Sequence, residues 1–367
     1  MKNLAAAQKR PDTILLLATL LLLTAGITMI YSSSSILALE KFKDGQYFLK
    51  RQFFFILLGL IGMLILMKTP YQHLRRWAYP GLIMSVVLLV LLFVPHVGVK
   101  VNNATRWLRL GVFNFQVTEL VKVTMVIFLS YYLARKEVNP QDFIKGFLIP
   151  LVITLVIMAL ILRQPDFGTA VIIAMIMLSL LFLAGVRIRY LAGLLMLLLP
   201  LAVWQVMRSD YRWERLKTLL NPWRDPLGTG FQIIQSFISF GSGGAFGVGI
   251  GDGMQKLYYL PEPHTDFILS VIAEEGGFIA VALIISLFVI IIVRGFIIAY
   301  KAPDLFGTLV ASGLTLTIAV EAFINIAGVM GLIPVKGLVL PFVSYGGSSV
   351  VMSLATIGIL LNISSYR

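Results

Sequence analysis

Asp266 stands where a long polar stretch, ending in PEPHT, gives way to an apolar run. A carboxylate at such a boundary can act as a general base. It can also simply begin a helix, because the helix dipole stabilises an acid in the first turn, and on local grounds this structural interpretation is favoured. Glu274 and Glu275 follow deeper in the same apolar run. They are not expected to share a reaction centre with Asp266.

Two further pairs of polar residues lie inside apolar segments, where a charge is costly and is usually paired or functional. Glu119 and Lys122 are three residues apart and therefore share one helical face. They either neutralise one another or face a substrate, and both interpretations stay open. Glu321 and Asn325 are four residues apart and form a second polar stripe, for which a packing role is favoured.

A last cluster, RQPD at 163–166, lies between two apolar segments. From composition alone, Asp166 is expected to cap the helix that follows. The glycine run GSGGAFGVGIGDG at 241–253 lacks the GxxxxGK[ST] spacing of a phosphate loop, so a flexible turn is expected there.

The elements that must position these residues are apolar helices. Of the 367 residues, 59% are hydrophobic and 13% are charged, whereas soluble domains average about 25% charged. The apolar runs do not alternate with polar residues, which excludes a membrane β-barrel. About 20 apolar residues cross a bilayer as a helix. The sequence therefore predicts an all-α polytopic membrane protein with about ten transmembrane helices, near 13–38, 49–67, 77–95, 117–134, 144–162, 167–185, 188–207, 266–293, 304–330 and 343–363.

One large loop, residues 209–265 between the seventh and eighth spans, interrupts a single membrane domain of residues 1–367. The distribution of Lys and Arg over the short loops places both termini in the cytoplasm and this loop outside. Residues 211–220 and 231–240 each carry an apolar stripe, which predicts two short amphipathic helices in the interface. The net charge of +13 divides between the inner loops and this outer loop, so no nucleic-acid partner is expected.

Five motifs extend over nearly the whole chain and resemble the SEDS family (shape, elongation, division and sporulation). They are RWLRLGVFNFQVTELVK at 106–122, RQPDFGT at 163–169, DPLGTGFQIIQSFISFGSGGAFGVGIG at 225–251, LYYLPEPHTDFILSVIAEEGG at 257–277 and KGLVLPFVSYGGSS at 336–349. The fourth and fifth motifs are closer to the FtsW division branch of that family than to the RodA elongation branch. Val117 and Thr118 depart from the Pro-Ser that the family usually has before the glutamate.

The resemblance implies a peptidoglycan glycosyltransferase that polymerises lipid II at the outer face of the cytoplasmic (inner) membrane during cell division. The donor is then linked to undecaprenyl pyrophosphate, and a single displacement inverts the anomeric centre. The implied partners are a class B penicillin-binding protein, which is a transpeptidase, and other division proteins, with the chain concentrated at the septum. The family's essential aspartate falls on Asp266, which reverses the structural interpretation given above.

With Asp266 as the catalytic base, a set of polar residues from these motifs is expected to bind substrate. They are Arg109, Glu119, Lys122, Arg163, Gln164, Asp166, Gln235, Ser236, His264, Thr265, Ser344 and Tyr345. A divalent cation, Mg²⁺ or Mn²⁺, with Asp266 as its candidate ligand, can bridge phosphate oxygens, and no organic cofactor is expected. Two alternatives stay open: a flippase that uses the polar residues within the spans, and a non-catalytic scaffold of the division machinery.

Overall fold

The computed structural model describes residues 10–95, 97–101, 104–111, 113–208, 210–256 and 260–366. Ten long helices occupy the ten expected spans, which confirms the all-α membrane class. They are α1 (Thr13–Phe42), α2 (Tyr47–Lys68), α3 (Leu74–Leu91), α4 (Val117–Leu133), α5 (Ile149–Arg163), α6 (Phe167–Leu183), α7 (Ile188–Met207), α10 (Ile268–Tyr300), α11 (Leu305–Val329) and α12 (Gly347–Ser364). Within the described ranges, seven helices are long and apolar enough to cross a membrane, so the count of ten spans stays a prediction.

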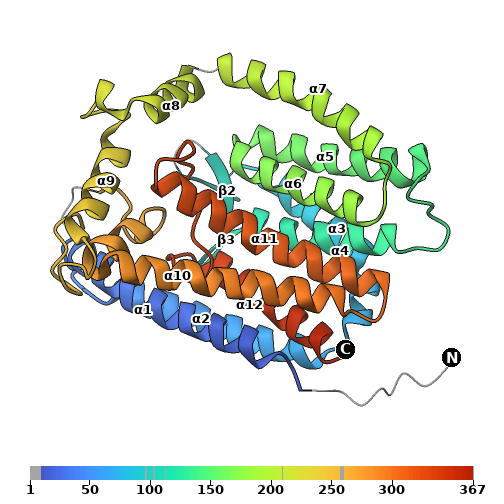
Figure 1. Ribbon diagram of the computed structural model, residues 1–367, viewed down its shortest axis with the longest axis horizontal. Coiled ribbons are helices and arrows are strands. Elements are labelled where there is room, and N and C mark those ends of the chain that lie inside the picture. Colours follow the sequence, from blue (N-terminus) through green and yellow to red (C-terminus); the bar gives the residue numbers. More distant parts are fainter. Residues whose placement is uncertain are drawn as a thin grey trace.

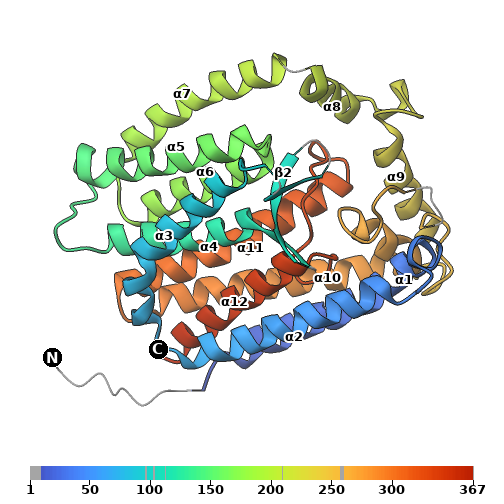
Figure 2. The same ribbon diagram turned by 180° about the vertical axis from the view of Figure 1, so that it is seen from behind.

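Most of these helices lie side by side in one bundle, as the two opposite views in Figures 1 and 2 show. The helix α4 is buried along nearly its whole length and contacts α3, α6 and α11. Because it is surrounded by protein, its charged residues do not face lipid. In both views α7 leans away from the rest of the bundle towards the large loop, residues 209–265.

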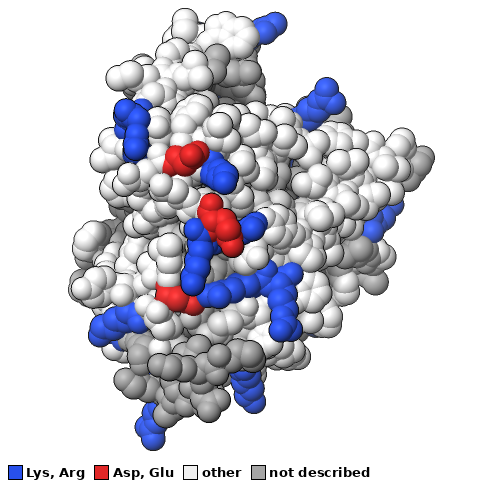
Figure 3. All heavy atoms as spheres, turned by 90° about the vertical axis from the view of Figure 1, so that its right-hand side faces the viewer, with Lys and Arg blue, Asp and Glu red and all other residues white. Residues whose placement is uncertain are grey.

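One end of the bundle joins the start of the first helix to the end of the last. The Asp12 amide donates to Ser364 Oγ (3.0 Å), and the Asp12 carboxylate pairs with Arg294 of α10 (2.5 Å). Figure 3 views this end, over which Lys and Arg side chains are spread with few Asp and Glu. That distribution is the one expected of a cytoplasmic face, and the orientation of the termini stays a prediction.

A small antiparallel sheet between α3 and α4 was not expected from the sequence. Its strands are β1 (Gly98–Val101), β2 (Ala104–Leu110) and β3 (Phe113–Gln116), in the order β1-β2-β3. Gly111 has a positive φ of 62° in the turn between β2 and β3, a conformation that glycine adopts without strain. The large loop is therefore not the only sizeable region outside the helices.

The large loop contains the two expected short helices, α8 (Asp210–Leu220) and α9 (Phe231–Gly243), with a 3₁₀ turn, η3 (Pro222–Arg224), between them. Two other 3₁₀ or π-helical turns lie elsewhere, η1 (Tyr71–His73) before α3 and η2 (Phe143–Leu148) before α5.

The glycine run at 241–253, which begins in the last turn of α9, packs closely against α10 rather than forming the expected flexible turn. Val248 N donates to Glu274 O and Phe278 N donates to Gly244 O, each at 2.9 Å. These bonds bridge a break in α10 at Gly277, where φ is 67°. A Cβ at Gly247 would lie 2.1 Å from Glu275 O, so the two backbones approach too closely for any residue but glycine.

Candidate active site

Asp266 lies in the turn directly before α10, two residues ahead of the first helical residue, Ile268. Its carboxylate faces the backbone of the segment 330–346, which links α11 to α12, because a Cβ at Gly337 would lie 3.1 Å from Asp266 Oδ2. Among the described residues, none donates a hydrogen bond to this carboxylate. An acid that is largely buried and has no donor is unusual and makes this position a candidate functional site.

The surroundings of Asp266 raise its pKa towards neutral pH. Burial, with a smaller contribution from the charge of Glu262, raises the pKa of Asp266 from 3.8 to about 7, and Arg106 and Arg215 partly oppose this. A base with a pKa near the working pH combines a useful ionised fraction with sufficient proton affinity.

Arg106 of β2 lies beside the second aspartate of the site. Its Nε is 3.3 Å from Asp166 Oδ2, and its Nη2 donates to Pro165 O at 3.3 Å. Asp166 also caps α6 as expected, accepting from the Thr169 amide (3.1 Å) and hydroxyl (2.8 Å). The cap and the ion pair together hold the Arg106 guanidinium at the site.

Two further cations reach the same region from other segments. Arg215 of α8 donates from Nη1 to Val335 O. The next residue, Lys336, has its Nζ 5.3 Å from the ring centroid of Phe167. Burial lowers the pKa of Lys336, and Asp166 partly opposes this. Three cations from β2, α8 and the segment 330–346 therefore lie around the two aspartates.

Arg106, rather than the predicted Arg109, is the arginine of the sheet that faces the aspartates. The two residues are an odd number apart on β2, so their side chains point to opposite faces. Arg109 is exposed, and no ion pair of it is found in the described part of the chain. Alternation along RWLRL would have shown that only one of the two arginines can face the site, if the segment had been recognised as a strand.

Gln164 and Arg163, the other predicted residues of the RQPD cluster, make no hydrogen bond or ion pair with Asp266 in the described structure. Gln164 is 1% exposed and donates to Leu89 O at 3.2 Å. Arg163 is exposed at the end of α5. Their predicted substrate contacts stay predictions.

Glu119, Lys122 and Glu321 form one buried network, although the sequence suggested two separate features. Lys122 Nζ is 2.8 Å from Glu119 Oε1 and also pairs with Glu321. Asn325, one turn after Glu321, donates to the Asp266 and Leu338 carbonyls. The geometry favours mutual neutralisation of the charges and confirms a packing role for Asn325.

His264 and Ser344, two of the residues predicted to bind substrate, are packed into the protein. His264 is buried, with its ring 4.5 Å from that of Phe48 and 5.6 Å from that of Tyr345. Burial lowers the pKa of His264, which favours its neutral form. Ser344 Oγ donates to Thr265 O (2.6 Å) and accepts from Leu340 N (2.9 Å), so its hydroxyl is already used within the protein.

Of the two residues predicted on α9, Ser236 docks that helix onto α10 and α11. Ser236 Oγ is fully buried, donates to Val329 O (2.6 Å) and lies 2.8 Å from Ser270 Oγ. Gln235 is half-buried, and its backbone carbonyl accepts from Ser239 Oγ at 3.0 Å within the helix, so its predicted substrate contact stays a prediction.

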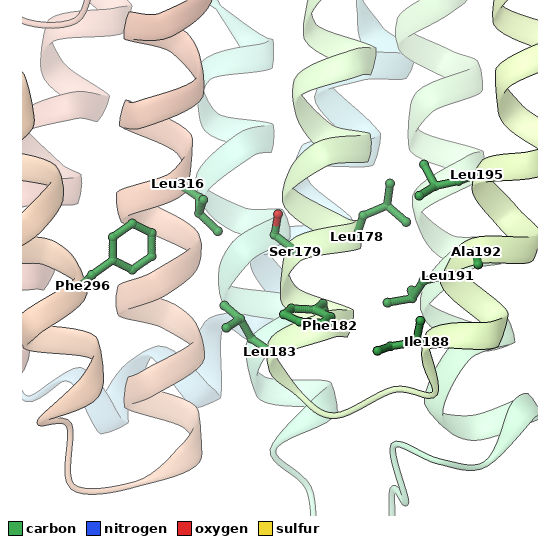
Figure 4. Close-up of a pocket in the computed structure, with 10 residues that line it drawn as sticks. All are labelled: Leu178, Ser179, Phe182, Leu183, Ile188, Leu191, Ala192, Leu195, Phe296 and Leu316. Carbon is green, nitrogen blue, oxygen red and sulfur yellow. The ribbon is translucent and has the colours of Figure 1, made fainter.

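A separate apolar cavity of ≈ 530 Å³ lies between α6 and α7, with Phe296 of α10 and Leu316 of α11 also in its lining (Figure 4). Apart from Ser179, its lining residues are apolar. Phe182 in this lining is about 22 Å along α6 from Phe167 at the site, given a rise of about 1.5 Å per residue. The cavity therefore provides no group for the chemistry at Asp266.

Comparison with known proteins agrees with the resemblance seen in the sequence. The probable peptidoglycan glycosyltransferase FtsW of Trichlorobacter lovleyi is 48% identical, over 96% of this chain and 93% of its own. Stage V sporulation protein E of Bacillus subtilis is 44% identical, over 97% of each chain.

Two solved structures share the fold. A chain of a peptidoglycan synthase complex that coordinates polymerization and crosslinking superimposes with a TM-score of 0.80 at 31% identity, covering 96% of this chain and 97% of its own. The rod shape determining protein RodA of Thermus thermophilus gives a TM-score of 0.71 at 26% identity, covering 96% of each chain. Residues 12–367 match the FtsW/RodA/SpoVE family, described as cell cycle proteins. The chain belongs to this family.

Proposed function

We propose that the chain is a peptidoglycan glycosyltransferase of the cytoplasmic membrane in which Asp266 is the general base. The observation that carries the proposal is the carboxylate of Asp266, which is largely buried, lacks a donor among the described residues and lies near Arg106 and Arg215. The names of its relatives support the activity. Lipid II, a disaccharide-pentapeptide on undecaprenyl pyrophosphate, is the proposed substrate.

In the proposed reaction, Asp266 takes the proton from the acceptor sugar hydroxyl as that oxygen attacks the anomeric carbon of the donor. A new carbon–oxygen bond forms while the bond from the anomeric carbon to the diphosphate breaks. The proton ends on the Asp266 carboxylate, and both electrons of the broken bond leave with the diphosphate. A single displacement of this kind inverts an α-linked donor to a β linkage and requires no carboxylate nucleophile.

The developing charge on the lipid diphosphate needs fixed cations at the moment of bond breakage. Arg106, Arg215 and Lys336 supply these from three separate segments. Asp166 holds Arg106 in place before substrate arrives, so this cation needs little reorganisation during the reaction.

A divalent cation would have few protein ligands at this site. In the described part of the chain, no three His, Cys, Asp or Glu side chains gather as a metal-binding group. Mg²⁺ is nevertheless commonly held by one or two carboxylates together with substrate phosphates. We therefore propose that any cation binds Asp266 together with the diphosphate, where it would neutralise phosphate charge, and that it is not held by the protein alone.

The transporter alternative depended on polar residues within the spans. Glu119, Lys122 and Glu321 bind one another in the interior, so they offer no free site along the bundle for a head group.

A crosslinking penicillin-binding protein as partner is supported by the fold shared with a chain of the peptidoglycan synthase complex. Assignment to division, concentration at the septum and a cytoplasmic position for both termini are part of the same proposal.

Polymerisation of fluorescent lipid II by the purified chain with its penicillin-binding partner tests the proposal. Asp266→Asn is expected to lower the rate of strand synthesis by about 10²- to 10⁴-fold, the contribution usual for general base catalysis. Asp304→Asn is the matched control, because Asp304 also precedes a helix, where it caps α11 and pairs with Arg75. Equal activity of the folded Asp266→Asn variant and the wild type would overturn the proposal.

A further inference from the structure

The backbone that carries Asp266 is fastened to other segments at three consecutive carbonyl groups. The carbonyls are those of His264, which accepts from the Tyr345 amide (2.9 Å), Thr265, which accepts from the Ser344 hydroxyl (2.6 Å), and Asp266, which accepts from the Asn325 side-chain amide (3.0 Å). All three donors belong to α11 or to the segment 330–346 that follows it. The direction of the Asp266 side chain is thus set from outside α10.

Asn325 uses both hydrogens of its amide group in this arrangement. The second bond goes to Leu338 O at 2.6 Å, and the side chain is 3% exposed. Leu338 directly follows Gly337, whose backbone faces the Asp266 carboxylate. One buried amide therefore holds both the Asp266 backbone and the Gly337–Leu338 backbone against which the Asp266 carboxylate lies.

Ser344 also links these two segments by hydrogen bonds. Its hydroxyl donates to Thr265 O and accepts from Leu340 N, so it too joins the turn before α10 to the segment 330–346. Ser344 is 3% exposed and has no donor left for a sugar or a phosphate. The geometry thus gives it a different role from the substrate contact expected from the sequence.

We propose that Asn325 and Ser344 are positioning residues for the reaction, which hold the Asp266 carboxylate against the Gly337 backbone without touching substrate. The inference rests on the proposed function of Asp266. When the hydrogen bonds of either residue are lost, the turn before α10 and the segment 330–346 separate. The Asp266 carboxylate then no longer meets the acceptor hydroxyl in line with the donor.

Asn325→Leu removes both donors while keeping a side chain of similar size. Asn362→Leu is its matched control, because the buried Asn362 also makes two hydrogen bonds, from Tyr71 N (2.8 Å) and to Met67 O (2.7 Å). Asn362 lies near the end of α12, at the opposite end of the bundle from the segment 330–346 (Figure 1). Ser344→Ala provides a second test that does not depend on the folding of the Asn325 variant.

The experiment measures lipid II polymerisation by each purified variant with its partner across a range of pH. Asn325→Leu and Ser344→Ala are each expected to lower kcat by about 10- to 100-fold and to change KM by less than about threefold. Asn362→Leu is expected to change neither value by more than about threefold.

The pH profile separates positioning from a general loss of stability. The charged groups that act on Asp266 are Glu262 on its own segment, Arg106 of β2 and Arg215 of α8. Release of the turn admits water to the carboxylate, so the acidic limb of kcat/KM moves to lower pH in both variants but not in Asn362→Leu. The inference is overturned if the Asn325 and Ser344 variants keep the wild-type kcat and acidic limb, or match the control, while Asp266→Asn is inactive. An active Asp266→Asn would instead overturn the proposed function, on which the inference depends.

Discussion

The buried, ionised carboxylate of Asp266 destabilises the folded chain at alkaline pH, so removing its charge should make the protein more stable there. The pKa of Asp266 is raised from 3.8 to about 7 in the folded chain. The folded state thus holds a proton that the unfolded state releases, and stability is lost as pH rises from about 4 through about 7. The whole difference corresponds to about 4 kcal/mol, and residual contact with water reduces the expected effect to about 2–4 kcal/mol.

Asp266→Asn keeps the shape of the side chain and removes the titration. We expect its apparent melting temperature to exceed that of the wild type by several degrees at about pH 8.5 and to match it at about pH 4. Thermal unfolding in detergent, followed by tryptophan fluorescence, gives the comparison.

Asp166→Asn is the informative control, because Asp166 caps α6 and pairs with Arg106. That variant should be less stable than the wild type, by about 1–3 kcal/mol. The reasoning would be refuted if Asp266→Asn were destabilised at alkaline pH, or if its difference from the wild type did not vary with pH.

Three further predictions concern the groups around and below the site. Glu262→Gln removes a charge that raises the pKa of Asp266, so the acidic limb of kcat/KM should move to lower pH in the polymerisation assay; an unmoved limb would contradict this. Lys122→Met leaves Glu119 and Glu321 buried without a cation and should cost about 3–5 kcal/mol in thermal unfolding, whereas Glu321→Gln should cost less because Lys122 retains Glu119; equal losses would contradict the buried network. Gly247→Ala places a Cβ 2.1 Å from Glu275 O and should cost about 3 kcal/mol or more in the same assay, while Gly244→Ala, with a similarly positive φ but open space, should cost about 1 kcal/mol; similar losses would argue against the close packing of the glycine run on α10.

The helices were predictable because each requires only local information. Apolar runs bounded by charges placed all ten, and the amphipathic stripes at 211–220 and 231–240 matched α8 and α9 closely. The strands at 98–116 were missed because four- to seven-residue strands leave too short a pattern to separate from a loop.

The site was predictable only where one segment carries it. Asp266 followed from the resemblance, and the cap at Asp166 followed from its position before a helix. The convergence of Arg106, Arg215 and Lys336 was not predictable, because it depends on how three distant segments pack. The pairing of Lys122 with Glu321, which are 199 residues apart in sequence, was missed for the same reason.

The pH dependence of kcat/KM for strand synthesis tests most directly whether Asp266 is the general base, because this ratio reports the essential groups of the free enzyme. For the wild type, the rate should rise with pH through an apparent pKa of about 7, as the carboxylate loses its proton. In Asp266→Asn, the residual rate should show no such limb. A variant that keeps the same limb would show that another group titrates and would contradict the assignment of Asp266.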